Sequence, residues 1–229
     1  MANSARTKPG EERITPEVNP LNTLQDRYEA NKKQINTIVT VVLVVVLGYL
    51  AYSRLYKAPQ EEKAATAISY PQRYMQYDSL NRALNGDGQH SGFLKIAKKY
   101  DGTKAANLCH YYAGVCYMHM GDFNNAIKQL KEFDGKGTLV QTAANGLLGD
   151  AYMESNNTKQ GIEYYKKASE DRDNSLLTPT YLYRVGVAYE LSGNTEEAKK
   201  AYKRIKTEYP QSYEARDIDK YLARLGELE

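Results

Sequence analysis

Four residues that can bind metals or act as nucleophiles lie close together in the middle of the chain: Cys109, His110, Cys116 and His119. On a helix, Cys116 and His119 would be neighbours, whereas Cys109 would lie two turns before Cys116 and His110 would point to another face. A tetrahedral metal site needs its ligands to converge on one point. We therefore predict core and groove residues of a helical protein here, and no metal site.

No other chemistry-bearing pattern predicts an enzyme. The remaining histidine, His90, stands alone, and the glycines occur at predicted helix contacts and turns, where they form no phosphate-binding loop. Pairs such as Glu196 and Lys200 are typical of a solvated helix face. We expect no catalytic residues, no cofactor and no bound metal.

The elements that position these residues recur along the chain. Residues 111–130 (YYAGVCYMHMGDFNNAIKQL), 146–165 (GLLGDAYMESNNTKQGIEYY) and 183–202 (YRVGVAYELSGNTEEAKKAY) share one pattern. Each has a glycine, an aromatic residue three positions later, a polar two-residue turn, a small residue, and a bulky residue four positions after that. In order, these are Gly114, Tyr117, Gly121-Asp122, Ala126 and Leu130; Gly149, Tyr152, Asn156-Asn157, Gly161 and Tyr165; and Gly186, Tyr189, Gly193-Asn194, Ala198 and Tyr202.

This pattern predicts antiparallel helix pairs. The glycines would let two helices approach, and the tyrosines would fill the space between one pair and the next. No pair can bury its apolar face alone, so the pairs should stack into a solenoid. We predict an all-α fold with a degenerate unit at 65–104, repeats at 107–140, 142–175 and 179–212, and a capping helix at 212–226 after Pro210.

Residues 35–53 (INTIVTVVLVVVLGYLAYS) carry no charge and form the most apolar stretch of the chain. A helix of this length reaches roughly 28 Å, about the thickness of the hydrocarbon core of a bilayer. Tyr49, Tyr52 and Tyr56, with Arg54 and Lys57, resemble an interfacial anchor. We predict a transmembrane helix at 35–56, with Pro59 breaking the helix. The alternatives are a buried strand or core helix, and a signal peptide cleaved after the small residues Ala51 and Ser53.

The span divides the chain into a tail (1–34) and a large domain (57–229). Residues 17–34 suggest a short amphipathic helix through Leu21, Leu24 and Tyr28, and the residues before them have a disordered composition. Basic residues are almost equally frequent on both sides of the span, so charge does not decide orientation. From Lys57 onward the chain contains 24 Lys and Arg and 23 Asp and Glu. This near-neutral balance does not suggest a nucleic-acid partner.

The repeated segments resemble the tetratricopeptide repeat (TPR) family over about residues 107–210. The departures are Gly161, where Ala is usual, and Thr158 and Thr195, where an aromatic residue is usual. The complete arrangement, including KAANLCHYYAGVCYMHMGDFNNAIKQL, resembles the YfgM-type ancillary subunit of the bacterial Sec translocon.

This second resemblance implies a single-pass protein of the bacterial inner membrane with a cytoplasmic N-terminus and a periplasmic C-terminal domain. It also implies protein partners: the translocation channel and a membrane-anchored periplasmic folding factor of the prolyl-isomerase type.

The TPR pattern implies a concave surface lined by the first helix of each pair. Its partner-binding residues would be Tyr111, Val115, Met118, His119, Asp150, Met153, Tyr183, Val187 and Glu190. The basic clamp with which some TPR domains hold a C-terminal carboxylate is missing, because Tyr111 and Val115 occupy its places. Tyrosine and methionine suit an apolar, adaptable partner, although several of these residues could instead pack against the terminal helix.

Three functions remain open: a membrane-anchored module that assists protein export or periplasmic folding, a cytosol-facing anchored TPR receptor or scaffold, and a structural subunit of an envelope secretion or motility machine.

Overall fold

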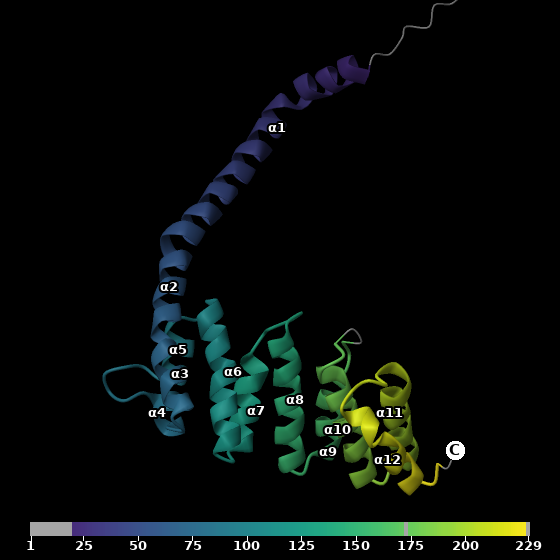
Figure 1. Cartoon of the computed structure of the whole chain (residues 1–229). Coiled ribbons are helices and arrows are strands. Elements are labelled where there is room, and N and C mark those ends of the chain that lie inside the picture. The colour runs from purple at the N-terminus through teal and green to yellow at the C-terminus, as the bar shows by residue number, and fades with distance from the viewer. Residues whose placement is uncertain (1–19, 172–173, 228–229) are drawn as a thin grey trace, which may run out of the picture. The chain divides into compact units, whose positions relative to one another are not determined.

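The computed structural model describes residues 20–171 and 174–227, with side-chain surroundings from Tyr28 onward (Figure 1). The described chain is helical throughout and contains no strand, only an isolated bridge between Gly86 and Ser91. It divides into two units, Met1–Leu55 and Tyr56–Glu229. The all-α prediction is confirmed.

The first unit contains one long helix, α1 (Pro20–Ala51). The separate amphipathic helix expected at 17–34 is absent from the described part, because α1 runs without a break from Pro20 into the apolar stretch; residues 1–19 lie outside the described residues. Side chains along the apolar stretch are exposed, including Ile38, Val44 and Leu47. Within the described residues this is the one helix long and apolar enough to cross a membrane.

Pro59 does not break the helix, contrary to the sequence prediction. A π-helical turn (Tyr52–Lys57) follows α1, and Pro59 then lies in the first turn of α2 (Ala58–Ala67). Proline lacks an N–H and its ring clashes with the carbonyl four residues back. A proline in the first turn of a helical segment avoids both costs. The π-helical turn at Tyr52–Lys57 allows α2 to begin there while the chain remains helical.

The second unit begins with four short helices: α2, α3 (Ser69–Gln76), α4 (Leu80–Asn85) and α5 (Phe93–Lys99). Glu61 of α2 fixes this segment to the next helix, α6 (Lys104–His119), because its carboxylate accepts the backbone N–H groups of Lys104 and Ala105 at 2.8 and 3.1 Å. A carboxylate is favourable at a helix N-terminus, where these N–H groups have no partner within the helix.

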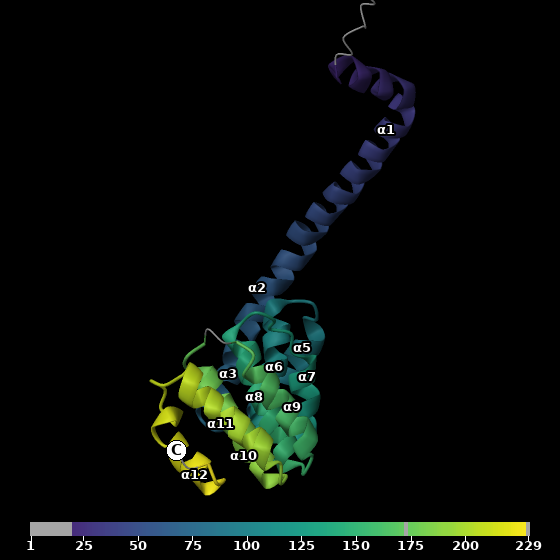
Figure 2. The same ribbon diagram turned by 90° about the vertical axis from the view of Figure 1, so that its right-hand side faces the viewer.

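Three helix pairs follow and stack one behind the next (Figures 1 and 2). They are α6 with α7 (Phe123–Glu132), α8 (Leu139–Glu154) with α9 (Thr158–Ala168), and α10 (Leu177–Leu191) with α11 (Thr195–Glu208).

The predicted two-residue turns are present in all three pairs. The first residue of each turn has a positive φ: 73° at Gly121, 58° at Asn156 and 76° at Gly193. The second donates its backbone N–H to the carbonyl of the repeated tyrosine, at 2.9 Å for Tyr117, 2.8 Å for Tyr152 and 2.9 Å for Tyr189. This left-handed turn provides a hydrogen-bond donor for a carbonyl in the last turn of the first helix and reverses the direction of the chain.

The glycine of each repeat is the contact point of its helix pair. A Cβ atom added to Gly114 would lie 2.5 Å from Leu130, one added to Gly149 would lie 2.3 Å from Tyr165, and one added to Gly186 would lie 2.2 Å from Tyr202. These partners are the bulky residues that the repeat pattern singled out. The small and large residues of the pattern are therefore direct neighbours across each pair.

The predicted capping helix over residues 212–226 is wrong in extent. The chain forms a 3₁₀ turn (Glu214–Arg216) and then a seven-residue helix, α12 (Ile218–Arg224). The Ser212 hydroxyl accepts the N–H of Ala215 and supports the 3₁₀ turn, while Asp217, at φ −110° and ψ 1°, is not helical. Buried Ile218 and Leu222 then attach α12 to the core.

Candidate protein-binding surface

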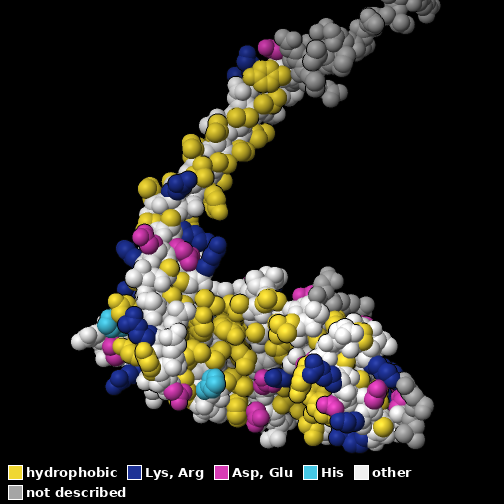
Figure 3. Space-filling model, viewed as in Figure 1, with side chains coloured by type: hydrophobic (Ala, Val, Ile, Leu, Met, Phe, Trp, Pro, Cys, Tyr) yellow, Lys and Arg dark blue, Asp and Glu magenta, His cyan; other side chains and the backbone are white. Residues whose placement is uncertain are grey.

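The first helices of the three pairs, α6, α8 and α10, carry the residues predicted to bind a partner. On α6, Tyr111, Val115 and Met118 are half-buried and follow one face at helical spacing, and His119 is exposed at the end of the helix. The space-filling view has a continuous apolar area over α6 and α8 (Figure 3). Half-buried Leu108 precedes Tyr111 on the same face, and Tyr111 packs against Phe133 at a centroid distance of 5.5 Å.

The two predicted residues of α8 are engaged inside the fold. The Met153 side chain occupies the space above Gly161 of α9, since a Cβ atom at Gly161 would lie 2.6 Å from its sulfur. This contact accounts for the glycine at a position where the family has alanine. Met153 therefore packs within its own helix pair and is less available to a partner than predicted.

Asp150 forms a polar link between the second and third pairs. Its Oδ1 accepts the hydroxyl of Tyr165 at 2.6 Å and also pairs with the guanidinium of Arg184 on α10. Burial, followed by this hydrogen bond, raises the pKa of Tyr165. Arg184 is not among the residues predicted from the sequence to bind a partner. Asp150 thus holds adjacent repeats together. The predicted surface is charged at Asp150 and Arg184, whereas it is apolar over α6.

The C-terminal segment covers the face of α10. The Thr180 hydroxyl donates to Glu214 at 2.6 Å and the Tyr183 hydroxyl donates to Tyr221 at 2.8 Å. Farther along α10, Arg224 donates to both carboxylate oxygens of Glu190, at 2.8 and 2.7 Å.

Two of the three predicted α10 residues, Tyr183 and Glu190, therefore pack against the terminal segment, as the alternative interpretation had it. Val187 lies between them, half-buried. Burial, together with the hydrogen bond to Tyr221, raises the pKa of Tyr183 to about 12.

The residues first considered for metal chemistry do not converge. Cys109 and Cys116 are buried free thiols in the core between α5 and α6, and His110 lies 3.0 Å from the Gln129 side-chain oxygen. Over the described ranges, no three His, Cys, Asp or Glu side chains form a group that could hold a metal ion.

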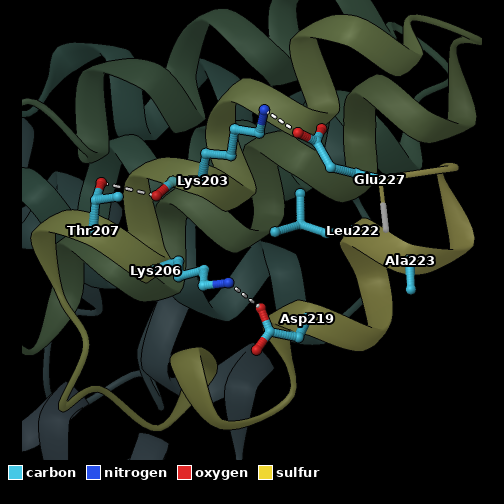
Figure 4. A pocket seen from close by; sticks show the side chains of 7 residues that line it. All are labelled: Lys203, Lys206, Thr207, Asp219, Leu222, Ala223 and Glu227. Atoms are coloured by element: carbon cyan, nitrogen blue, oxygen red, sulfur yellow. Dashed lines mark hydrogen bonds and ion pairs between the residues drawn. The ribbon is translucent and has the colours of Figure 1, made fainter. Parts of the chain in front are cut away.

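A cleft of about 480 Å³ lies between α11 and α12 (Figure 4). Both lysines that line it are paired with acidic residues across it: Lys203 with Glu227, and Lys206 with Asp219 at 3.0 Å. These ion pairs hold the terminal segment against α11. We interpret the cleft as part of the packing of α12, and we assign no ligand to it.

Comparison with known proteins identifies the repeats. Family models described as tetratricopeptide repeat match residues 109–134, 142–170 and 180–212. The domain has the fold of a TPR-like helical solenoid. The three matched segments contain the three helix pairs almost completely, and the surface of α6, α8 and α10 corresponds to the first-helix face of the matched repeats.

Two solved structures share this fold. The crystal structure of MamA protein is 17% identical, with a TM-score of 0.51, over 72% of this chain and 88% of that chain. A crystal structure described as putative kinesin light chain nearly identical TPR-like repeats, from Podospora anserina, is 14% identical, also with a TM-score of 0.51, over 72% of this chain and 85% of that chain. No match was found among curated proteins. At these identities the similarity concerns the fold alone.

Proposed function

We propose that this protein is a membrane-anchored TPR module that holds an apolar segment of a partner protein on the first-helix face of α6 and α8. The single observation that carries the proposal is the unequal covering of this face. The chain's own C-terminal segment covers α10 through Tyr183 and Glu190, whereas Tyr111, Val115 and Met118 of α6 remain partly exposed, with Tyr111 packed against Phe133.

The chemistry of the open part defines the kind of partner. A tyrosine, a valine and a methionine at successive helical turns offer apolar contacts and few hydrogen bonds, and methionine adapts to irregular surfaces. An amphipathic helix or an extended apolar segment fits such a face. The apolar part of the surface ends at Asp150 and Arg184, which are charged. These two side chains pair with each other and offer no apolar contact to a partner.

The anchor supports a role close to a membrane. The α1 helix carries the exposed apolar stretch, and a single span would raise the effective concentration of the module for other membrane-bound proteins. We propose a span at 35–56 with a cytoplasmic tail and a periplasmic domain in a bacterial inner membrane. The resemblance to YfgM-type subunits supports this orientation and suggests the Sec channel and a prolyl-isomerase-type folding factor as partners.

The test is co-purification from native membranes in mild detergent, quantified by mass spectrometry. Replacing Tyr111 and Met118 together with Ala should reduce recovery of the partner at least about tenfold, because central apolar contacts often contribute ~2 kcal/mol each. The matched control is Leu191→Ala, which shortens an exposed leucine at the far end of α10. Helix content by circular dichroism must be equal in both variants.

Two outcomes would overturn the proposal. In one, the double variant recovers as much partner as the control. In the other, residues 1–57 alone retain the partner, so that the tail or span is the binding element. A reporter fused after Glu229 tests the orientation separately, since a cytosolic signal would favour the receptor or scaffold interpretation.

A further inference from the structure

An exposed leucine lies at the N-terminus of both α8 and α10. Leu139, the first residue of α8, is 62% exposed, and Leu176, immediately before α10, is 77% exposed. Both follow short polar stretches, residues 134–138 and 169–175. Single exposed leucines are common, but these two occupy equivalent positions of successive repeats, each at the N-terminus of a first helix.

Both leucines lie at the end of the solenoid where the N-terminal ends of α6, α8 and α10 lie side by side (Figure 1). Two contacts of α6 support this. Asn107, in its first turn, exchanges hydrogen bonds of 2.8 and 2.9 Å with the backbone of Asp134, in the loop that ends at Leu139. Glu61 caps the same end of α6.

The chain enters the second unit at this end. Glu61 is five residues after Tyr56, where the second unit begins, and Tyr56 directly follows the first unit with its apolar helix. If α1 spans a bilayer, connectivity keeps Glu61, and with it the start of α6, within a short distance of the lipid headgroups.

The second helices α5, α7, α9 and α11 end at this side of the solenoid with lysine in the last turn, but most of these ammonium groups already have partners. Lys131 lies over the ring of Tyr152, Lys166 lies over the ring of Tyr189, and Lys206 pairs with Asp219. Acidic residues, among them Glu132, Asp134, Glu170 and Asp171, also lie here. The apolar side chains and the tether, rather than net charge, therefore carry the inference.

We propose that this end of the solenoid rests on the membrane surface, with Leu139 and Leu176 inserted among the lipid headgroups. The proposal rests on the membrane span proposed above. The occupant of this surface is lipid, because the tether keeps the start of α6 near the bilayer and leucine supplies apolar burial at the headgroup level.

The chain contains no tryptophan, so a single introduced one reports its own surroundings. Leu139→Trp and Leu176→Trp would be made in the full chain and reconstituted into phosphatidylcholine vesicles that contain brominated lipid. We expect blue-shifted emission and quenching by bromine in both variants. The matched control is Leu191→Trp, since Leu191 is 72% exposed at the opposite end of α10 and should emit as in water.

A fourth variant, Leu43→Trp, reports on the span itself. Quenching of Leu43→Trp together with Leu139→Trp and Leu176→Trp, but not Leu191→Trp, supports the proposal. If Leu43→Trp is quenched while the two loop variants match Leu191→Trp, surface docking is wrong and the anchor stands. If Leu43→Trp is not quenched, the span fails and the docking proposal falls with it. Equal quenching of Leu191→Trp would also overturn the docking proposal, because no one end would then face the lipid.

Discussion

The ring of Tyr165 lies directly on Gly149, with its Cδ1 atom 2.3 Å from the point where a Cβ atom of residue 149 would be. Real Cβ atoms essentially never approach another heavy atom this closely, so any larger residue must move α8 away from α9. Because Tyr165 also donates to Asp150, the displacement would disturb the link to the third repeat.

Replacing Gly149 with Leu should therefore destabilise the domain. Overpacking of this kind costs about 1–3 kcal/mol, which corresponds to a melting temperature roughly 2–10 °C lower for a domain of this size. Thermal unfolding followed by circular dichroism in detergent measures the change. Glu154→Ala, on the exposed end of the same helix, is the control. An unchanged melting temperature would mean that the two helices do not touch at residue 149.

Loss of the contacts to α10 should loosen the C-terminal segment. In the variant with Arg224→Ala and Tyr221→Phe, Glu190 loses its guanidinium partner and the Tyr183 hydroxyl its acceptor. We expect backbone amides of α12 to exchange hydrogen roughly threefold to tenfold faster, as measured by mass spectrometry. Lys220→Ala is the matched control, because Lys220 pairs only locally, with Asp217 of the same segment. Equal exchange in both variants would contradict the covering role.

The two thiols should be unreactive in the folded protein. Burial raises the pKa of Cys109 to about 12 and that of Cys116 to about 11. At pH 8 a thiol-specific disulfide reagent should label neither at a measurable rate, because the thiolate is the reactive form and the sulfurs are inaccessible. In concentrated urea both should react within minutes. Glu154→Cys, an exposed position, should react at once in the native protein. Rapid native labelling of Cys109 would show that the core between α5 and α6 opens.

Stability should fall on the alkaline side. The pKa values of Cys109, Cys116 and Tyr183 are raised by burial above the ordinary values of 9 for cysteine and 10 for tyrosine. The folded state thus retains protons that the unfolded state has released. The stability contributed by these groups is complete below about pH 9 and is lost as the pH rises towards about 11–12. The midpoint of urea unfolding should be steady from about pH 7 to 8.5 and then decrease. If the urea concentration at the midpoint instead increased between pH 9 and pH 11, the assignment of these pKa values would be wrong.

The repeating part of the fold could be predicted from sequence because each contact recurs. The period brings Gly121, Asn156 and Gly193 to equivalent positions, and each has the positive φ that ends its helix. The same period pairs Gly149 with Tyr165 and Gly186 with Tyr202. A contact repeated three times is visible in one sequence.

Contacts that occur once could not be predicted in this way. The hydrogen bond from Tyr183 to Tyr221 joins two residues 38 positions apart, and nothing elsewhere in the chain repeats it. The repeat pattern alone therefore predicts Tyr183 and Glu190 on the open surface, with packing against the terminal helix only as an alternative. Gly161, smaller than the alanine usual in the family, is the one sequence signal of such a contact, because the Met153 side chain occupies the space beside it.

Glu61 gives the protein a particular response to force. Its two hydrogen bonds to the first N–H groups of α6 close a loop of the chain that contains α3, α4 and α5. Tension applied at Tyr56 would therefore be transmitted into α6 through this carboxylate, while the three short helices within the loop remain unstretched. A pull from the N-terminal side would load these two hydrogen bonds together with the apolar packing of the same segment, including buried Ile68, before the first repeat could extend.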